Sequence, residues 1–147
     1  MEILKVRNVK TPSRGTKGSA GIDFFVPEIE DPIYVPHGGH ALIPSGIKAI
    51  VPKGHALIAF NKSGVATKKG LTVGACVVDE DYHGEIHIHV INSTIGPVFI
   101  NPGEKLVQFL LVPILSVPIE EVSKCEFESM LPDSERGEGG FGSTGVC

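Results

Sequence analysis

Glycine and proline interrupt this chain so often that they constrain its fold more than any other feature. The 147 residues include 18 glycines and 11 prolines. We identify no segment of about 12 residues or more that keeps a clean helical period of apolar residues without one of these breakers. Short runs rich in valine and isoleucine recur between them, which is typical of strands. The sequence therefore predicts an all-β fold.

The composition fits one acidic domain. With 41% apolar residues, a chain of this length can bury one ordinary core. The formal net charge of -4 and the pI near 5.8 leave no basic stripe to release counterions from a nucleic-acid backbone. We therefore expect no nucleic-acid partner, and any phosphate that binds here is small.

Cysteine usage and the lack of long apolar runs predict the compartment. Cys76, Cys125 and Cys147 are an odd number and form no disulfide framework, which suits a reducing cytosol. The N-terminal residues contain no apolar signal core, and no run approaches the roughly 20 apolar residues that a membrane-spanning helix needs. We expect a soluble, cytoplasmic protein with no membrane partner.

Residues 137–145, Gly-Glu-Gly-Gly-Phe-Gly-Ser-Thr-Gly, are unsuited to a packed core. Glycine fills no volume and loses the most backbone freedom on folding. Backbone amides and two hydroxyls can wrap an anion, Arg136 can add charge, and the Phe141 ring can stack on a flat group. These features favour a lid over a nucleotide phosphate, and a solvated tail is the alternative.

An isolated carboxylate lies near the start of the chain. Residues 3–6 are predicted to form the opening strand, and residues 11–21 a loop. Asp23 then follows in an otherwise apolar strand, so its carboxylate must be hydrogen-bonded, paired or near a cation. An Asx turn at the start of the strand is the alternative.

Residues 61–70 depart from the β pattern and predict one short helix after a Ser-Gly step. The backbone amides at the start of that helix, the Ser63 hydroxyl and the Lys62 ammonium could all point at one phosphate. Serine and glycine before a helix also make an ordinary N-cap. The segment alone does not distinguish the two interpretations.

Residues 77–90 predict a hairpin with an acidic turn. Two valines that we expect to be buried precede Asp79, whose carboxylate at the end of the strand can accept a proton from a water or hydroxyl. Tyr82 supplies a flat ring three residues later. On the return strand, period two places Ile86, Ile88 and Val90 toward the core.

The histidines of the predicted sheet are weak candidates for a metal site. His87 and His89 share the face of the return strand opposite its isoleucines, where a metal, a polar sheet face or a subunit contact would each explain them. His40 and His55 open two similar strands, near water. They lack the close Cys or His pairing of a zinc site.

Gln108 is the only polar side chain in the apolar run 106–112, so its amide needs partners. Pairing within the core and contact with a bound phosphate both satisfy this requirement.

Taken together, these segments resemble the trimeric dUTP diphosphatases, or dUTPases. The resemblance covers nearly the whole chain through five short motifs in the family's order, and five in order are highly specific. They are residues 20–23 (Ala-Gly-Ile-Asp), 62–66 (Lys-Ser-Gly-Val-Ala), 78–85 (Val-Asp-Glu-Asp-Tyr-His-Gly-Glu), 103–108 (Gly-Glu-Lys-Leu-Val-Gln) and 136–145.

The resemblance implies a distorted β jelly roll of the β-clip type with one short helix, assembled as a homotrimer. Residues 1–132 would form the catalytic core, and residues 133–147 an arm that closes over a neighbouring subunit's site. Asp79 would be the general base that aligns a water for attack on the α-phosphorus of dUTP, releasing dUMP and diphosphate. This reaction removes dUTP from the nucleotide pool and supplies dUMP for dTMP synthesis.

The resemblance also implies how the substrate and its metal are held. Tyr82 would pack beneath the deoxyribose and exclude a ribose 2′-hydroxyl. The backbone from Gly74 to Val78 would recognise uracil, with Phe141 stacked over the ring. Mg²⁺ would bridge the phosphate oxygens. Asp23 would lie near this ion, either contacting it through a water molecule or lying behind its direct ligands. The residues at the triphosphate would be Lys62, Ser63, Gly64, Gln108, Arg136, Gly142, Ser143 and Thr144.

The sequence departs from the family pattern at four positions, none of them the implied base. Lysine replaces a common arginine at Lys62 and Lys105, and it is a point charge that cannot form a bidentate fork to phosphate. Cys76 replaces a common glycine and His83 a common arginine.

Two other functions compete with dUTP hydrolysis. A dCTP deaminase of the same fold would carry a catalytic glutamate where this chain has His89. A non-catalytic protein that senses nucleotides would have no need of Asp79, Tyr82 and the complete tail.

Overall fold

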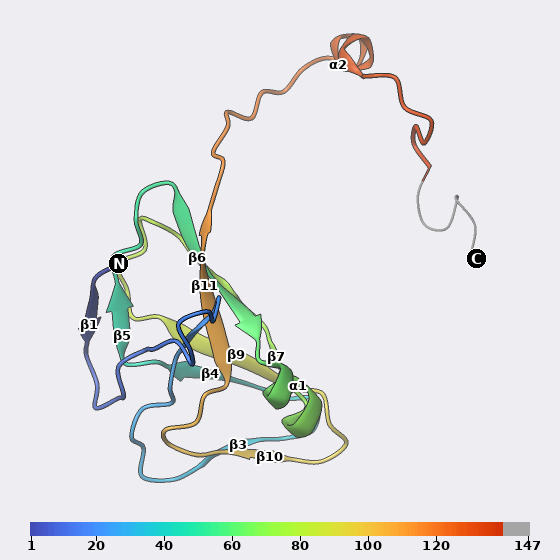
Figure 1. Cartoon of the computed structure of the whole chain (residues 1–147). Helices are drawn as coiled ribbons and strands as arrows, with labels where there is room; N and C mark the ends of the chain where they lie inside the picture. The colour runs from blue at the N-terminus through green and yellow to red at the C-terminus, as the bar shows by residue number, and fades with distance from the viewer. Residues whose placement is uncertain (140–147) are drawn as a thin grey trace. The chain divides into compact units, whose positions relative to one another are not determined.

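A computed structural model of the chain describes residues 1–139, which divide into two compact units, Met1–Ser116 and a second unit that begins at Val117. The all-β prediction is confirmed, because strands dominate the first unit (Figure 1). The elements in chain order are β1 (Ile3–Lys5), β2 (Ile22–Asp23), β3 (Ile33–Val35), β4 (His40–Pro44), β5 (Ile47–Ala49), β6 (His55–Asn61), α1 (Ser63–Lys69), β7 (Leu71–Val73), β8 (Val77–Val78), β9 (His87–Asn92), β10 (Val98–Ile100), β11 (Val107–Pro113) and α2 (Lys124–Met130).

The strands of the first unit form small antiparallel sheets. The largest has the order β2-β11-β6-β8, and a three-stranded sheet has the order β4-β9-β7. Two further pairs, β1 with β5 and β10 with β3, complete the set among the described residues. The long central ladder joins β6 to β11 from Asn61 opposite Val107 to His55 opposite Pro113. Figure 1 shows these two strands side by side.

The core of this unit is made by alternating strand residues. Ile86, Ile88 and Val90 are each 1% exposed, so the predicted period-two pattern around β9 is confirmed. The buried rings of Phe24 and Phe109 contact each other with their centroids 4.4 Å apart. This core holds β2, β6, β9 and β11 in register and thereby fixes the side chains at their ends.

The predicted hairpin of residues 77–90 is wrong, because its two arms lie in different sheets. β8 pairs with β6, whereas β9 pairs with β4 and β7. The pairing with β9 ends at Gly74, whose N–H donates to the carbonyl of His89, and two residues later the carbonyl of Cys76 accepts from Ala59 on β6. The chain therefore changes sheets within residues 74–76.

The prediction of one short helix is also corrected, because α2 is a second one. It lies in residues 119–131, which contain neither glycine nor proline. Ser123 and Glu126 form a reciprocal capping box at its start, a signal that the sequence displays as Ser-x-x-Glu. Neither helix in residues 1–139 has the length and apolar character needed to cross a membrane.

Candidate active site

Asp23 is a buried carboxylate that two lysines share. Its side chain on β2 is 7% exposed and forms ion pairs through Oδ1 with Lys62 and through Oδ2 with the Nζ of Lys105, at 3.1 Å. Lys62 directly follows β6 and Lys105 precedes β11, so the sheet register brings both to β2. The prediction that this carboxylate is paired is confirmed.

The two lysines also determine the ionisation of Asp23. Burial by itself would raise the pKa of this carboxyl. The hydrogen bonds and the positive charges of Lys62 and Lys105 together outweigh burial, and the pKa lies below its ordinary value. A carboxyl whose pKa is lowered by folding stabilises the protein above its unfolded pKa, and this contribution disappears as the pH falls through the folded pKa.

We therefore expect Asp23→Asn to lower the free energy of unfolding by about 1 to 2 kcal/mol at neutral pH. The difference from wild type should begin to shrink as the pH falls below about 3.9, the pKa of an unfolded aspartate, and should disappear only below the lowered pKa of Asp23 in the folded protein. Urea unfolding of both proteins at a fixed protein concentration, repeated across this pH range, measures the difference in the free energy of unfolding. Asp81→Asn, a change at an exposed carboxylate, is the control. An undiminished difference at low pH would contradict the ion-pair account.

Gln108 is held next to Asp23 by backbone and by a glycine. It lies opposite Asp23 in the β11–β2 register, and its Nε2 donates to the carbonyl of Asn61 at 3.0 Å. A Cβ placed on Gly21 would lie 2.2 Å from Gln108 Oε1, so only glycine fits beneath this amide. The amide thus has a partner within the chain, and its contact with a phosphate stays a prediction.

Helix α1 begins immediately after Lys62. Lys62 is its N-cap and Ser63 its first residue, with no capping hydrogen bond from a side chain. The interpretation of Ser63 as an ordinary N-cap is therefore wrong, because the helix starts one residue earlier than that role requires. Ser63 and Gly64 lie in the first turn, and the left-handed Gly70, with φ of 61°, ends the helix.

A separate cavity of about 180 Å³ lies where the chain changes sheets. Gly74 precedes it, and a Cβ there would lie 2.1 Å from the His89 ring, so the close approach of β9 requires glycine. The cavity brings together the predicted residues Val78, Asp79 and Tyr82. Its complete lining is Leu42, Ala75, Cys76, Val77, Val78, Asp79, Tyr82, Ile86, His87 and Phe109.

Asp79 follows β8 directly and is exposed in the single chain. The expectation that buried valines precede it is wrong: Val77 is 58% exposed and Val78 only half-buried. The reason is that β8 is a two-residue edge strand that pairs with β6 alone. An exposed carboxylate beside a cavity can contact a water and a ligand together, which general-base chemistry requires.

The histidines of β9 are occupied by hydrogen bonds within the chain. His89 Nδ1 accepts from the Ala75 N–H at 2.7 Å, and its Nε2 lies 3.1 Å from His40 Nδ1. His87 Nδ1 lies 2.9 Å from the Glu85 carbonyl, which can only accept, so this nitrogen carries the proton. Residues 1–139 contain no cluster of three metal-ligating side chains.

The cavity and the Asp23 cluster do not meet within one chain. Val78 lies opposite Leu57 near the start of β6, whereas Lys62 follows the end of that strand. Asp79 directly follows Val78. At a rise of about 3.3 Å per residue, Asp79 and Lys62 are therefore separated by about 20 Å along β6. The predicted base and the predicted phosphate ligands occupy opposite ends of β6.

The remaining predicted residues lie in the second unit or beyond the described part of the chain. In residues 117–139, the Arg136 side chain donates from Nε to the Gly139 carbonyl at 2.7 Å. Phe141, Gly142, Ser143 and Thr144 lie outside the described residues.

Sequence reasoning missed two contacts of these sites. Lys105 forms an ion pair with Asp23. The sequence does indicate such a partner, since an isolated buried carboxylate needs a nearby cation. Arg7 forms an ion pair with Glu85 beside the cavity. Nothing in the sequence marks this partner, which is 78 residues away.

The fold is that of the solved dUTPases. The structure of the Staphylococcus bacteriophage 80alpha dUTPase with dUPNHPP matches with a TM-score of 0.84 and 25% identity, covering 99% of this chain and 98% of that one. The family model for dUTPase matches residues 7–145, and the chain therefore belongs to the dUTPase family.

Curated relatives agree with this assignment. The deoxyuridine 5′-triphosphate nucleotidohydrolase of Chlamydia pneumoniae is 40% identical over 137 residues, which are 92% of this chain and 90% of that protein. The enzyme of the same name from Bdellovibrio bacteriovorus is 38% identical over 149 residues, covering 99% of this chain and 95% of that protein.

Proposed function

We propose that this dUTPase hydrolyses dUTP to dUMP and diphosphate, with Asp79 as the general base. The observation that supports the proposal is the cavity at the sheet change, whose lining includes Asp79 and Tyr82, in a chain of the dUTPase family. The phage 80alpha dUTPase binds dUPNHPP, and the curated relatives are named for hydrolysis of deoxyuridine triphosphate.

Asp79 accepts a proton from the water that attacks the α-phosphorus. Its exposed carboxylate follows a strand fixed by pairing with β6, so the turn after β8 sets its position. General-base action of this kind contributes a factor of about 10² to 10⁴ in rate. The rest of the acceleration comes from positioning of the phosphates and neutralisation of their charge.

The cavity holds the nucleoside. Backbone groups from Gly74 to Val78 recognise uracil, because the chain leaves its β9 ladder there and residues 75–78 line the cavity. Tyr82 lies beneath the deoxyribose and leaves no room for a 2′-hydroxyl. Phe141 stacks over the base from the C-terminal arm.

The Asp23 end of the sheet holds the triphosphate. Lys62 and the first turn of α1 supply charge and backbone N–H groups, and the Gln108 amide lies next to them. The residues proposed for phosphate contact are Lys62, Ser63, Gly64, Gln108, Arg136, Gly142, Ser143 and Thr144.

A complete site is proposed to need several copies of the chain. The separation of Asp79 from Lys62 along β6 supports a homotrimer in which each site takes the base from one subunit and phosphate ligands from another. In this assembly residues 1–132 form a distorted jelly-roll core, and residues 133–147 reach a neighbouring subunit. The exposed apolar side chains of Leu115, Val117 and Ile119 support burial of residues 115–119 in the assembly.

Mg²⁺ is proposed to arrive with the substrate and not to occupy a site made by the chain. Both carboxylate oxygens of Asp23 are paired with lysines, so its donors do not fit direct ligation. Mg²⁺ is commonly bound through substrate phosphates with its remaining positions filled by water. Asp23 would approach such an ion only through a water molecule.

Incubation with dUTP and with dCTP, each with Mg²⁺, tests the proposed function. We expect diphosphate and dUMP from dUTP, and neither diphosphate nor ammonia from dCTP. Ammonia from dCTP would favour the deaminase, although His89 occupies the position of its glutamate and is engaged with Ala75. Binding of dUTP without any product would favour a nucleotide-sensing protein.

A further inference from the structure

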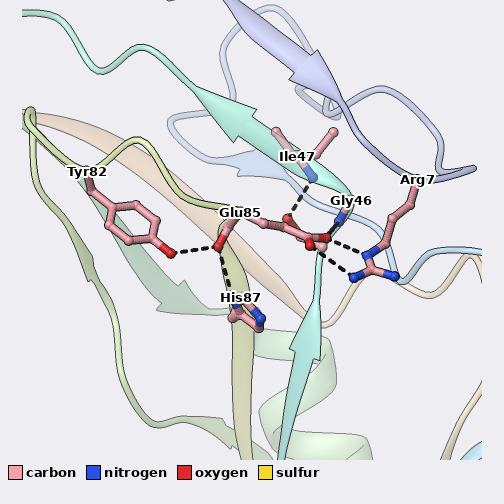
Figure 2. A network of polar contacts seen from close by, with 7 residues as sticks. Arg7, Gly46, Ile47, Tyr82, Glu85 and His87 are labelled. Carbon is pink, nitrogen blue, oxygen red and sulfur yellow. Dashed lines mark hydrogen bonds and ion pairs between the residues drawn. The ribbon is translucent and has the colours of Figure 1, made fainter.

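Tyr82 is tethered by a polar network that begins in the N-terminal segment (Figure 2). Its hydroxyl donates to the backbone carbonyl of Glu85 at 2.9 Å. The same carbonyl accepts from His87 Nδ1, so both of its acceptor positions are used. The orientation of the Tyr82 ring therefore depends on where the peptide group of Glu85 is held.

The side chain of Glu85 is held from two sides. Arg7 donates to both carboxylate oxygens, from Nε at 2.6 Å and from Nη2 at 3.1 Å. The N–H of Gly46, next to β5, donates to Glu85 Oε1 at 2.8 Å. A bidentate pair of this kind fixes direction as well as distance. These bonds attach the turn of residues 79–85 to the N-terminal segment and to the β4–β5 connection.

The Tyr82 ring has few other restraints. It is 43% exposed, so the core does not fix it. It lies against Gly84, where an added Cβ would be 2.4 Å from the tyrosine hydroxyl oxygen. The glycine provides space for the ring and the Glu85 carbonyl provides its only hydrogen bond within the described residues.

We propose that the Arg7–Glu85 ion pair positions Tyr82 and thereby sets the discrimination between deoxyribo- and ribonucleoside triphosphates. The inference rests on the proposed function, in which Tyr82 lies beneath the sugar. Exclusion of one hydroxyl group requires a ring that stays in place. When the ion pair is lost, the Glu85 peptide group keeps the hydrogen bond from the Ile86 N–H to the Ile47 carbonyl at 2.9 Å but loses the anchor of its side chain. The peptide can then tilt about this bond, the ring moves with it, and space opens for the 2′-hydroxyl.

The first experiment measures the position of Tyr82 without reference to activity. The chain has two tyrosines and no tryptophan, so in a Tyr34→Phe background tyrosine emission comes from Tyr82 alone. We expect Arg7→Met and Glu85→Gln each to lower the emission anisotropy of the full-length protein. Lys69→Met is the matched control, because it removes another partly exposed ion pair, to Glu104, that does not touch Tyr82. Unchanged anisotropy in both test variants would overturn the positioning role.

The second experiment measures the ratio of kcat/KM for dUTP to kcat/KM for UTP. We expect Arg7→Met and Glu85→Gln to lower this ratio by a factor of about 10, since misplacement by an ångström costs up to about 10²-fold. Lys69→Met should leave the ratio unchanged. In a Tyr82→Phe background, which already lacks the tether, Arg7→Met should change the ratio little further.

The outcomes separate this inference from the proposed function. Failure of the wild-type protein to cleave dUTP would overturn the function and with it the specificity role. Strong cleavage of dUTP with an unchanged ratio in the Arg7 and Glu85 variants would overturn the inference alone. A purely structural ion pair would lower thermal stability equally in the wild-type and Tyr82→Phe backgrounds and leave the ratio intact.

Discussion

Turnover of dUTP by an Asp79→Asn variant is expected to fall by a factor of about 10² to 10⁴, because the amide cannot accept the proton of the attacking water. The substitution preserves size, and Asp79 is exposed after an edge strand, so we expect the fold to be unaffected. Nucleotide binding should stay nearly intact, since the general base does not hold the phosphates. Single-turnover kinetics and calorimetric titration with dUPNHPP measure the two properties separately.

Asp81→Asn is the matched control for this prediction. Asp81 is an exposed carboxylate of the same acidic turn, and removing its charge changes the local electrostatics by a similar amount. We expect this variant to retain wild-type turnover. Near-normal turnover of Asp79→Asn, or an equal loss in both variants, would remove Asp79 from its proposed role.

Deletion of the chain beyond Pro132 is expected to reduce hydrolysis by at least about 10²-fold while the strands still fold. The proposed phosphate and base contacts of Arg136 and Phe141 are removed, whereas the compact unit Met1–Ser116 is untouched. Circular dichroism and size-exclusion chromatography report the fold and the assembly, and diphosphate release reports activity.

Two full-length variants distinguish loss of these contacts from loss of assembly. Phe141→Ala removes only the ring that would stack on the base, and Arg136→Met only one charge. We expect both to form the same oligomer as the wild type and to lose less activity than the deletion variant does. A truncated trimer with wild-type activity would contradict the proposed lid.

Local sequence patterns correctly predicted part of the fold. Period two around β9 correctly placed Ile86, Ile88 and Val90 in the core, because alternation within one strand is a short-range property. The same approach could not predict which strand β8 pairs with. The pairing of β8 depends on the position of β6, a strand about 20 residues earlier in the chain, which no short window of sequence contains.

The sequence alone determined the all-β class, the five motifs and the grouping of Asp79 with Tyr82, since these residues are neighbours in the chain. Only the tertiary structure showed that Asp23 is shared by Lys62 and Lys105, and that Asp79 lies at the other end of β6. Only the tertiary structure paired Arg7 with Glu85 across 78 residues. The physical reason is that each strand's register, set by packing of the whole core, decides which distant side chains meet.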